Sequence, residues 1–199
     1  MFIWSYGGVM SRQQDERPAP GSARRDAVLE SALGTFARFG YRKTSMEEVA
    51  RAARISRPGL YFLFDSKEAL FRAAATQMLE RDIAAVERVL ADPDRPLGER
   101  LLEAFDQWAG RYVGPLARDI TEVIEANPDL LGPIAQTLSQ RFGQLLTDAI
   151  AAVCGPDSAA RAAPTLISTS IGLKRQVASQ ELYRERLATA IDLYLTGCR

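Results

Sequence analysis

Segment 44–70 limits what this chain can fold into, because it marks several helix starts in close succession. Ser45 stands three residues before Glu48, and Asp65 stands three residues before Glu68. Each pair has the form of a capping box, in which the two side chains satisfy free N–H groups at a helix N-terminus. We therefore predict one helix that begins after Ser45 and another that begins after Asp65.

A second short helix fits between these two starts. Ser56 is suited to cap it, and Pro58 falls in its first turn, where a missing backbone N–H costs little. The apolar residues that would close the turn recur at helical spacing: Met46, Val49, Ala50, Ala53, Ile55, Leu60 and Phe64. The pattern predicts a helix-turn-helix whose second helix, roughly residues 57–64, lies in a DNA major groove.

The residues around this motif resemble the N-terminal DNA-binding domain of the TetR (tetracycline-repressor-like) transcriptional regulators. The resemblance covers about residues 24–70. It rests on an ordered set of features: the turn Phe39-Gly40-Tyr41, Thr44-Ser45 before a helix, Leu60-Tyr61 followed by Phe64, and Ser66-Lys67-Glu68. It implies an all-α protein with an N-terminal three-helix DNA-binding domain, followed by a C-terminal helical ligand-binding and dimerisation domain.

The charge distribution agrees with a DNA-binding module. Lys and Arg number 25 in the whole chain, as do Asp and Glu. From residue 24 to residue 67, however, nine basic residues face five acidic ones, and the rest of the chain has the matching deficit. A basic module on an acidic body favours phosphate contact by the module alone.

The composition also excludes several kinds of site. The chain has no histidine, which removes histidine-based acid–base catalysis and Ser–His–Asp triads. Cys154 and Cys198 are too far apart for a CxxC metal site, and two cysteines make no disulfide framework. We expect two incidental thiols, with a redox-sensing role as the minor alternative. No cofactor, metal or enzymatic activity is expected.

The chain divides into three predicted parts: a disordered arm at 1–22, the helix-turn-helix domain at 23–70, and a helical effector-binding and dimerisation domain at 71–199. The first nine residues lack the positive charge of a signal peptide, so translation from Met10 is an alternative start. No segment is apolar over the length of a bilayer, and a cytoplasmic location is expected.

The remaining sequence predicts helices throughout. The first runs from about Ala23 to Phe39, with Phe36 and Phe39 on its inner face and Gly40 as its stop. Further helices are expected at 66–90, at 97–113 with a stop at Gly114-Pro115, at 116–126, at 133–153, at about 158–179 with a kink at Pro164, and at 180–195.

By resemblance, the residues at the DNA are Thr44, Ser45, Ser56, Arg57, Pro58, Gly59, Tyr61, Phe62 and Lys67. Arg57 is the best base reader, because a guanidinium can pair bidentately with guanine. Lys67, Thr44 and Ser45 lie at helix N-termini, where phosphates bind. Phe62 and Leu63 depart from the polar or histidine residues usual in the family. This departure leaves the operator sequence open, and Leu63 either contacts DNA or packs inward.

For the body, aromatic residues and polar anchors near the predicted helix breaks are candidates for a ligand cavity: Phe105, Trp108, Tyr112, Arg118, Glu122 and Phe142. Ordinary core packing is the alternative for each aromatic one. The dimer interface of the family, a seam of two helices from each copy, implies Ile167, Ile171, Lys174, Leu187, Ile191, Tyr194 and Leu195, unless this stripe packs inside its own chain.

Two functions follow. The first is a dimeric regulator, most often a repressor, that binds a palindromic DNA operator and releases it when a small-molecule effector fills the body. The second is a helical DNA-binding or protein-interaction module without an effector.

Overall fold

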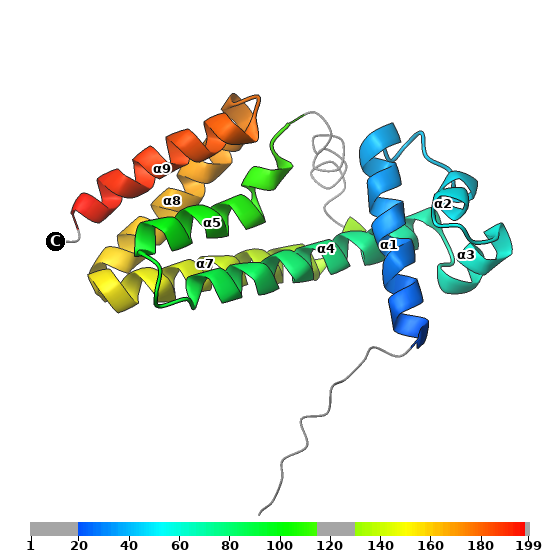
Figure 1. Ribbon diagram of the computed structural model, residues 1–199, viewed down its shortest axis with the longest axis horizontal. Helices are drawn as coiled ribbons and strands as arrows, with labels where there is room; N and C mark the ends of the chain where they lie inside the picture. Colours follow the sequence, from blue (N-terminus) through cyan, green and yellow to red (C-terminus); the bar gives the residue numbers. More distant parts are fainter. Residues whose placement is uncertain (1–19, 115–129, 198–199) are drawn as a thin grey trace, which may run out of the picture.

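The computed structural model describes residues 20–114 and 130–197, and every regular element in that part of the chain is a helix. The elements are α1 (Pro20–Phe39), α2 (Met46–Ala52), α3 (Arg57–Leu63), α4 (Lys67–Leu90), α5 (Leu97–Trp108), the 3-10 turn η1 (Gly110–Tyr112), α7 (Pro133–Cys154), α8 (Pro156–Gln176) and α9 (Gln180–Thr196) (Figure 1). The expected all-α architecture is therefore confirmed. Within the same residues, no helix combines the length and the apolar character that a membrane span requires.

The helices form two units joined by α4. Figure 1 shows α1, α2 and α3 gathered at one end of α4, which runs on alongside α7 beneath α5, α8 and α9. We call the first unit the head and the second the body. Each has its own buried apolar cluster, and α4 contributes residues to both. One rigid helix thus belongs to the core at either end of the molecule.

The head packs around an aromatic trio. The ring centroids of Phe36 and Phe71 lie 5.5 Å apart, and the ring of Tyr41 lies 4.8 Å from that of Phe71. Phe36 and Phe71 are fully buried. Phe39, which we predicted on the inner face of the first helix, is instead 52% exposed. It is the last residue of α1, where the turn at Gly40 (φ +84°) carries the chain away from the core.

The helix starts follow the predicted caps in two of three cases. The Ser45 hydroxyl accepts the Glu48 backbone N–H while the Glu48 carboxylate accepts the Ser45 N–H, so this capping box is confirmed. Ser56 likewise caps α3 by accepting the Gly59 N–H at 3.1 Å. The predicted box at Asp65 is wrong, because Ser66 is the N-cap of α4 and accepts the N–H of the residue three positions later.

The helix at residue 97 is shorter than predicted. It was expected to continue to residue 113, but α5 ends at Trp108 and the chain tightens into η1. Gly110 explains the change, since a Cβ there would lie 2.5 Å from the Asp106 carboxylate and 2.8 Å from the Tyr183 ring. The close packing of α9 therefore bends the chain at this glycine. The expected helix at 116–126 lies outside the described residues, and Pro164 sits inside an α8 that continues through it.

The head and body are also joined away from α4. Leu131, just before α7, is only 3% exposed and belongs to the head's apolar cluster, with Ile134 and Ala135 packed beside it. Arg72 on α4 donates to the Leu130 carbonyl at 2.7 Å. The boundary predicted after residue 70 therefore falls within packed structure: the head cluster continues along α4 to Ala75 and includes the approach to α7.

Candidate DNA-binding surface and effector pocket

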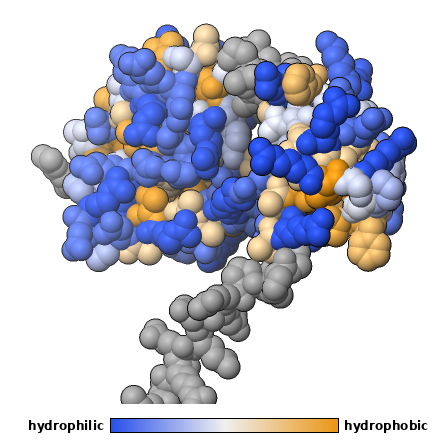
Figure 2. Space-filling model, turned by 45° about the vertical axis from the view of Figure 1, so that its right-hand side comes forward, coloured by the Kyte–Doolittle hydropathy of each residue, from blue (hydrophilic) through white to orange (hydrophobic). Residues whose placement is uncertain are grey.

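The outer face of α3 is exposed as a set of large side chains. Leu60 is fully buried and fixes the helix on the head, whereas Tyr61 is 41% exposed and Phe62 89% exposed. The Arg57 guanidinium lies 5.7 Å from the centre of the Tyr61 ring, one turn along the same face. Leu63 packs against the head core, which resolves the alternative left open for it. Figure 2 brings the head forward and shows hydrophobic side chains interrupting a largely hydrophilic surface.

The turn between α2 and α3 contains Arg54, a residue whose role the sequence did not predict. Arg54 has φ +54° and is the only non-glycine residue with positive φ in the described part of the chain. Its N–H donates to the Arg51 carbonyl, and the next N–H, from Ile55, reaches back to Ala50. These bonds close the end of α2 in the way that a glycine usually does. The sequence offered no signal, because arginine gives no preference for the left-handed region.

Gly59 has a local reason to lack a side chain. A Cβ at this position would lie 3.0 Å from the Ser56 hydroxyl, which is the cap of α3. A larger residue would therefore press on the cap as well as on any DNA beneath it. The resemblance predicted that Gly59 lies at the DNA, and the cap is an additional constraint within the protein.

Two of the predicted phosphate contacts are engaged inside the head. Thr44 is only 2% exposed, and its hydroxyl donates to the Gly40 carbonyl at 2.8 Å, so the prediction of a DNA contact through this side chain is corrected. The Lys67 ammonium donates to the carbonyls of Tyr41 (3.1 Å) and Thr44 (3.2 Å) and lies 4.6 Å from the centre of the Tyr41 ring. Lys67 thus holds the α1–α2 turn on the N-terminus of α4.

The neighbouring acids are held ionised by the same caps. The Ser45 backbone N–H and hydroxyl lower the pKa of Glu48. Hydrogen bonds from its own backbone N–H, from Ser66 and from Tyr41 lower the pKa of Glu68. Burial, and secondly the Glu68 charge, raise the pKa of Tyr41 to about 12. Ser45, Ser56, Arg57, Pro58 and Tyr61 remain exposed on the head, where DNA can reach them.

The body contains a cavity of about 780 Å³ between α5, η1, α7 and α8. Four of the six predicted ligand residues line it: Phe105, Trp108, Tyr112 and Phe142. Trp108 and Phe142 stack with ring centroids 5.1 Å apart, and Phe105 meets Phe142 edge to face at 5.3 Å. The other two, Arg118 and Glu122, lie outside the described residues.

The wall that α8 contributes was not predicted. Ile167, Ser170, Ile171 and Lys174 fall on one face of this helix and line the cavity together with Arg175. Ile167, Ile171 and Lys174 were noted only as part of a stripe at helical spacing. That stripe was assigned to a dimer seam, and sequence spacing alone could not tell a cavity wall from an interface.

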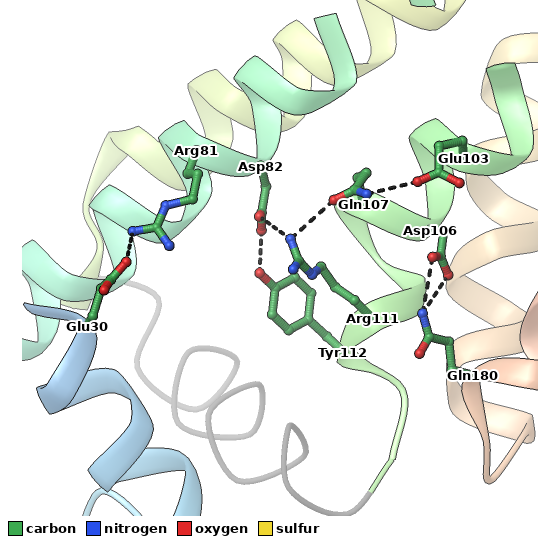
Figure 3. Close-up of polar contacts among 9 residues, drawn as sticks. All are labelled: Glu30, Arg81, Asp82, Glu103, Asp106, Gln107, Arg111, Tyr112 and Gln180. Carbon is green, nitrogen blue, oxygen red and sulfur yellow. Dashed lines mark hydrogen bonds and ion pairs between the residues drawn. The ribbon is translucent and has the colours of Figure 1, made fainter. Parts of the chain in front are cut away.

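A buried carboxylate beside the cavity was also missed. Asp82 on α4 is 1% exposed and accepts hydrogen bonds from the Tyr112 hydroxyl and from Arg111, the latter at 3.1 Å (Figure 3). Burial raises the pKa of Asp82, although both partners oppose the rise. The sequence signal was present, because Asp82 interrupts the apolar stripe of α4 four residues before Val86.

A second buried carboxylate, that of Asp106, belongs to α5 and contacts α9. Asp106 is 8% exposed, accepts the Gln180 amide at 2.9 Å, and forms an ion pair with Arg184 at 2.7 Å. Figure 3 shows both acids on helices that flank η1. Each carboxylate beside the cavity thus has a cation and a neutral donor of its own.

The predicted dimer residues fall into different environments. Leu187 and Ile191 are 0% and 1% exposed in the core of their own chain, so their assignment to a seam is corrected. The helical spacing of the two residues does put them on one face of α9, but that face packs into the core of the same chain. Tyr194 and Leu195 pack partly on the same core. The exposed apolar side chains on these helices are Ile171 (54%) and Leu193 (73%).

Comparison with known proteins shows which family of sequences the head resembles. Residues 28–74 match the sequence profile described as "Bacterial regulatory proteins, tetR family". The HTH-type transcriptional regulator RutR of Escherichia coli K12 is 42% identical over 59 residues, which are 30% of this chain and 28% of RutR. Residues 28–74 are therefore a DNA-binding domain of the TetR family. This confirms the resemblance seen in the sequence.

Other relatives extend the match into the body. The HTH-type transcriptional repressor ComR of E. coli K12 is 30% identical over 132 residues, covering 63% of this chain and 61% of ComR. The chain is thus aligned with less than two thirds of either curated relative. A transcriptional regulator from Saccharomonospora viridis, solved with choline, has a TM-score of 0.69 at 20% identity, over 86% of this chain and 96% of that one, which shows a shared fold.

Proposed function

We propose that this chain is a TetR-family transcriptional regulator that binds a DNA operator through α3. The observation that carries the proposal is the outward face of α3, where Arg57, Tyr61 and Phe62 are exposed on a helix-turn-helix fixed from below by Leu60. Arginine reads guanine bidentately, and an exposed aromatic ring contacts the thymine methyl group. The named functions of RutR and ComR support the same role.

We further propose that the working form is a homodimer on a palindromic site. A two-fold dimer presents two copies of α3 to successive major grooves, which a single short helix needs for tight binding. The exposed apolar residue Leu193 supports an interface on the outer face of α9. This proposal replaces the inward-facing pair Leu187 and Ile191.

We propose that the cavity holds a small-molecule effector whose binding releases the operator. The cavity is of the size that ligand sites use, and the similar fold from S. viridis holds choline. Two of its walls reach the head: Tyr112 bonds to Asp82 on α4, and Phe142 lies on α7, whose N-terminal end packs on the head. A ligand that favours one arrangement of these helices shifts the spacing of the two heads.

The test begins with selection of double-stranded DNA from a random pool by the intact protein. We expect a palindromic consensus bound by two copies, with an affinity that falls steeply with salt. Arg57→Ala should cost about 1–3 kcal/mol at particular base pairs of that consensus. Arg186→Ala, an exposed arginine on α9, is the matched control and should bind as the parent does.

The outcomes separate the proposal from its alternative. If Arg57→Ala selects the same consensus with unchanged affinity, α3 is not the reading helix. If the parent binds its consensus but no compound raises its melting temperature or releases the DNA, the chain is a DNA-binding module without an effector.

A further inference from the structure

The lining of the cavity has an uneven charge. Among the described residues that line it, Lys174 and Arg175 carry positive charge and none carries negative charge. The remaining walls are aromatic or aliphatic, apart from the hydroxyls of Ser139, Ser170 and Tyr112. A cavity with an apolar body and cations at one side is complementary to a molecule with an apolar body and an anionic group.

The two characters are separated along α8. Ile167 and Ile171 line the cavity one turn apart, and Lys174 follows on the same face nearly one further turn along. With a rise of about 1.5 Å per residue, Ile167 and Lys174 are separated by roughly 10 Å along the helix. The aromatic pair Trp108 and Phe142 forms another wall of the same cavity. A ligand that spans this length can place a flat ring against the aromatic wall and its charge near Lys174.

The nearby acids are not arranged to receive a cationic ligand. Asp82 is engaged by Arg111 and Tyr112, and Asp106 by Arg184 and Gln180. Neither Asp82 nor Asp106 lines the cavity. Arg175, in contrast, is exposed and forms no ion pair with any residue in the described ranges.

We propose that the effector of this chain is an aromatic carboxylate, held by Lys174 and Arg175 through its carboxylate and by Trp108 and Phe142 through its rings. This inference rests on the proposed effector function of the cavity and names its ligand class. It replaces the anchors expected from the sequence, Arg118 and Glu122, with two residues of α8. It also separates this cavity from a choline site, since choline is a cation.

The test uses three compounds with one ring system and different charge: anthracene-9-carboxylate, anthracene-9-carboxamide and 9-anthracenylmethylammonium. Binding to the full chain is measured by calorimetry. We expect the carboxylate to bind at least about tenfold more tightly than the amide, because hydrogen bonds between charged groups are the stronger ones. The ammonium compound should bind most weakly. Equal affinities, tightest binding of the ammonium compound, or no binding of any of the three would overturn the proposal.

Variants assign the effect to the two cations. Lys174→Met and Arg175→Met keep an unbranched apolar side chain and remove the charge, and each should reduce carboxylate affinity by about tenfold. The affinity for the amide should stay unchanged, which also shows that each variant is folded. Arg161→Met, an exposed arginine of α8 outside the cavity, is the control. If both cavity variants bind the carboxylate like the parent, its charge is recognised elsewhere and the proposal fails.

DNA binding is measured separately, so the two proposals fail in different ways. A chain that binds its operator but shows no preference for the carboxylate retains the regulator function and loses this ligand class. A chain that binds the carboxylate through Lys174 and Arg175 but no DNA retains the ligand site and loses the regulator function.

Discussion

The hydroxyl of Tyr112 donates its hydrogen bond to the buried carboxylate of Asp82. The bond joins η1, at the edge of the cavity, to α4, whose first half lies in the core of the head. Burial and the Asp82 carboxylate both raise the pKa of Tyr112, so the phenol remains the donor throughout the neutral range. A change at the cavity wall therefore has a direct connection to the helix that carries the head.

Removal of that bond should make stability more dependent on pH. The pKa of Asp82 is already raised by burial, so the folded state keeps this proton to higher pH than the unfolded chain, and stability falls as pH rises from about 3.8 through the raised pKa. The bond from Tyr112 opposes that rise. In Tyr112→Phe we therefore expect a loss of about 1–3 kcal/mol at pH 7 and a smaller loss at pH 4.

Urea unfolding at the two pH values measures the effect of Tyr112→Phe. Tyr61→Phe removes the same group from an exposed ring and should leave the free energy of unfolding nearly unchanged at both. An equal loss at pH 4 and pH 7 in Tyr112→Phe would mean that the bond does not affect the ionisation of Asp82.

Lys67 should act on both stability and DNA affinity. Its ammonium bonds to two carbonyls of the α1–α2 turn, so Lys67→Met should lower the melting temperature as well as weaken binding to all DNA sequences alike. Lys43→Met, at an exposed position of the same turn, should affect only DNA binding. If Lys67→Met melts at the temperature of the parent, the two carbonyl bonds contribute nothing measurable.

The left-handed residue in the helix-turn-helix should tolerate glycine better than arginine. Arg54 has φ +54°, which costs a non-glycine residue roughly 1–2 kcal/mol. Arg54→Gly should therefore raise the free energy of unfolding by about 1 kcal/mol, because part of the gain is lost to the freer unfolded chain. The matched change within α2, Arg51→Gly, should lower it by about as much. Chemical unfolding of the two variants shows whether the signs differ.

The contact between α7 and the head should support the stability of the head. Leu131 is 3% exposed in the head's apolar cluster, and Leu131→Ala should cost about 2–5 kcal/mol. Leu193→Ala, at a side chain 73% exposed, should cost much less in the folded chain. Hydrogen exchange of the α1 amides measures the local effect. Unchanged protection there in Leu131→Ala would show that the contact does not stabilise the head.

The proposed interface predicts different behaviour for neighbouring residues of α9. Leu193→Asp should yield a folded monomer by light scattering, because it places a charge on the outer face. Ile191→Asp should instead unfold the body, since Ile191 is 1% exposed within its own chain. If Leu193→Asp remains dimeric, the interface lies on another surface.

The sequence predicted the head more completely than the body, for a physical reason. The head is set by local signals, such as the cap formed by Ser45 and Glu48, which act within one helix turn. The spacing of Leu187 and Ile191 also predicted the correct helix. It did not show which neighbour the apolar face meets, because periodicity marks a buried face and does not distinguish the chain's own core from a second copy.

The sequence predicted the aromatic lining of the cavity but not the residues that α8 contributes. The aromatic residues of the predicted body helices included Trp108 and Phe142, which indeed stack beside the cavity. Lys174 and Arg175 of α8 come more than sixty residues after Trp108, and only the tertiary fold brings them to the same cavity. Asp82 could have been found, since a carboxylate within an apolar stripe of a helix needs a buried partner.

The insertion of Leu131 into the head bears on how such proteins diversify. A head cut from this chain at the end of its family match, residue 74, would leave an apolar pocket where Leu131 now packs. Exchange of heads between related regulators would then succeed only when the tip of α7 travels with them. The head and the body of this chain are therefore not independent parts, and a chimera must inherit the fit between them.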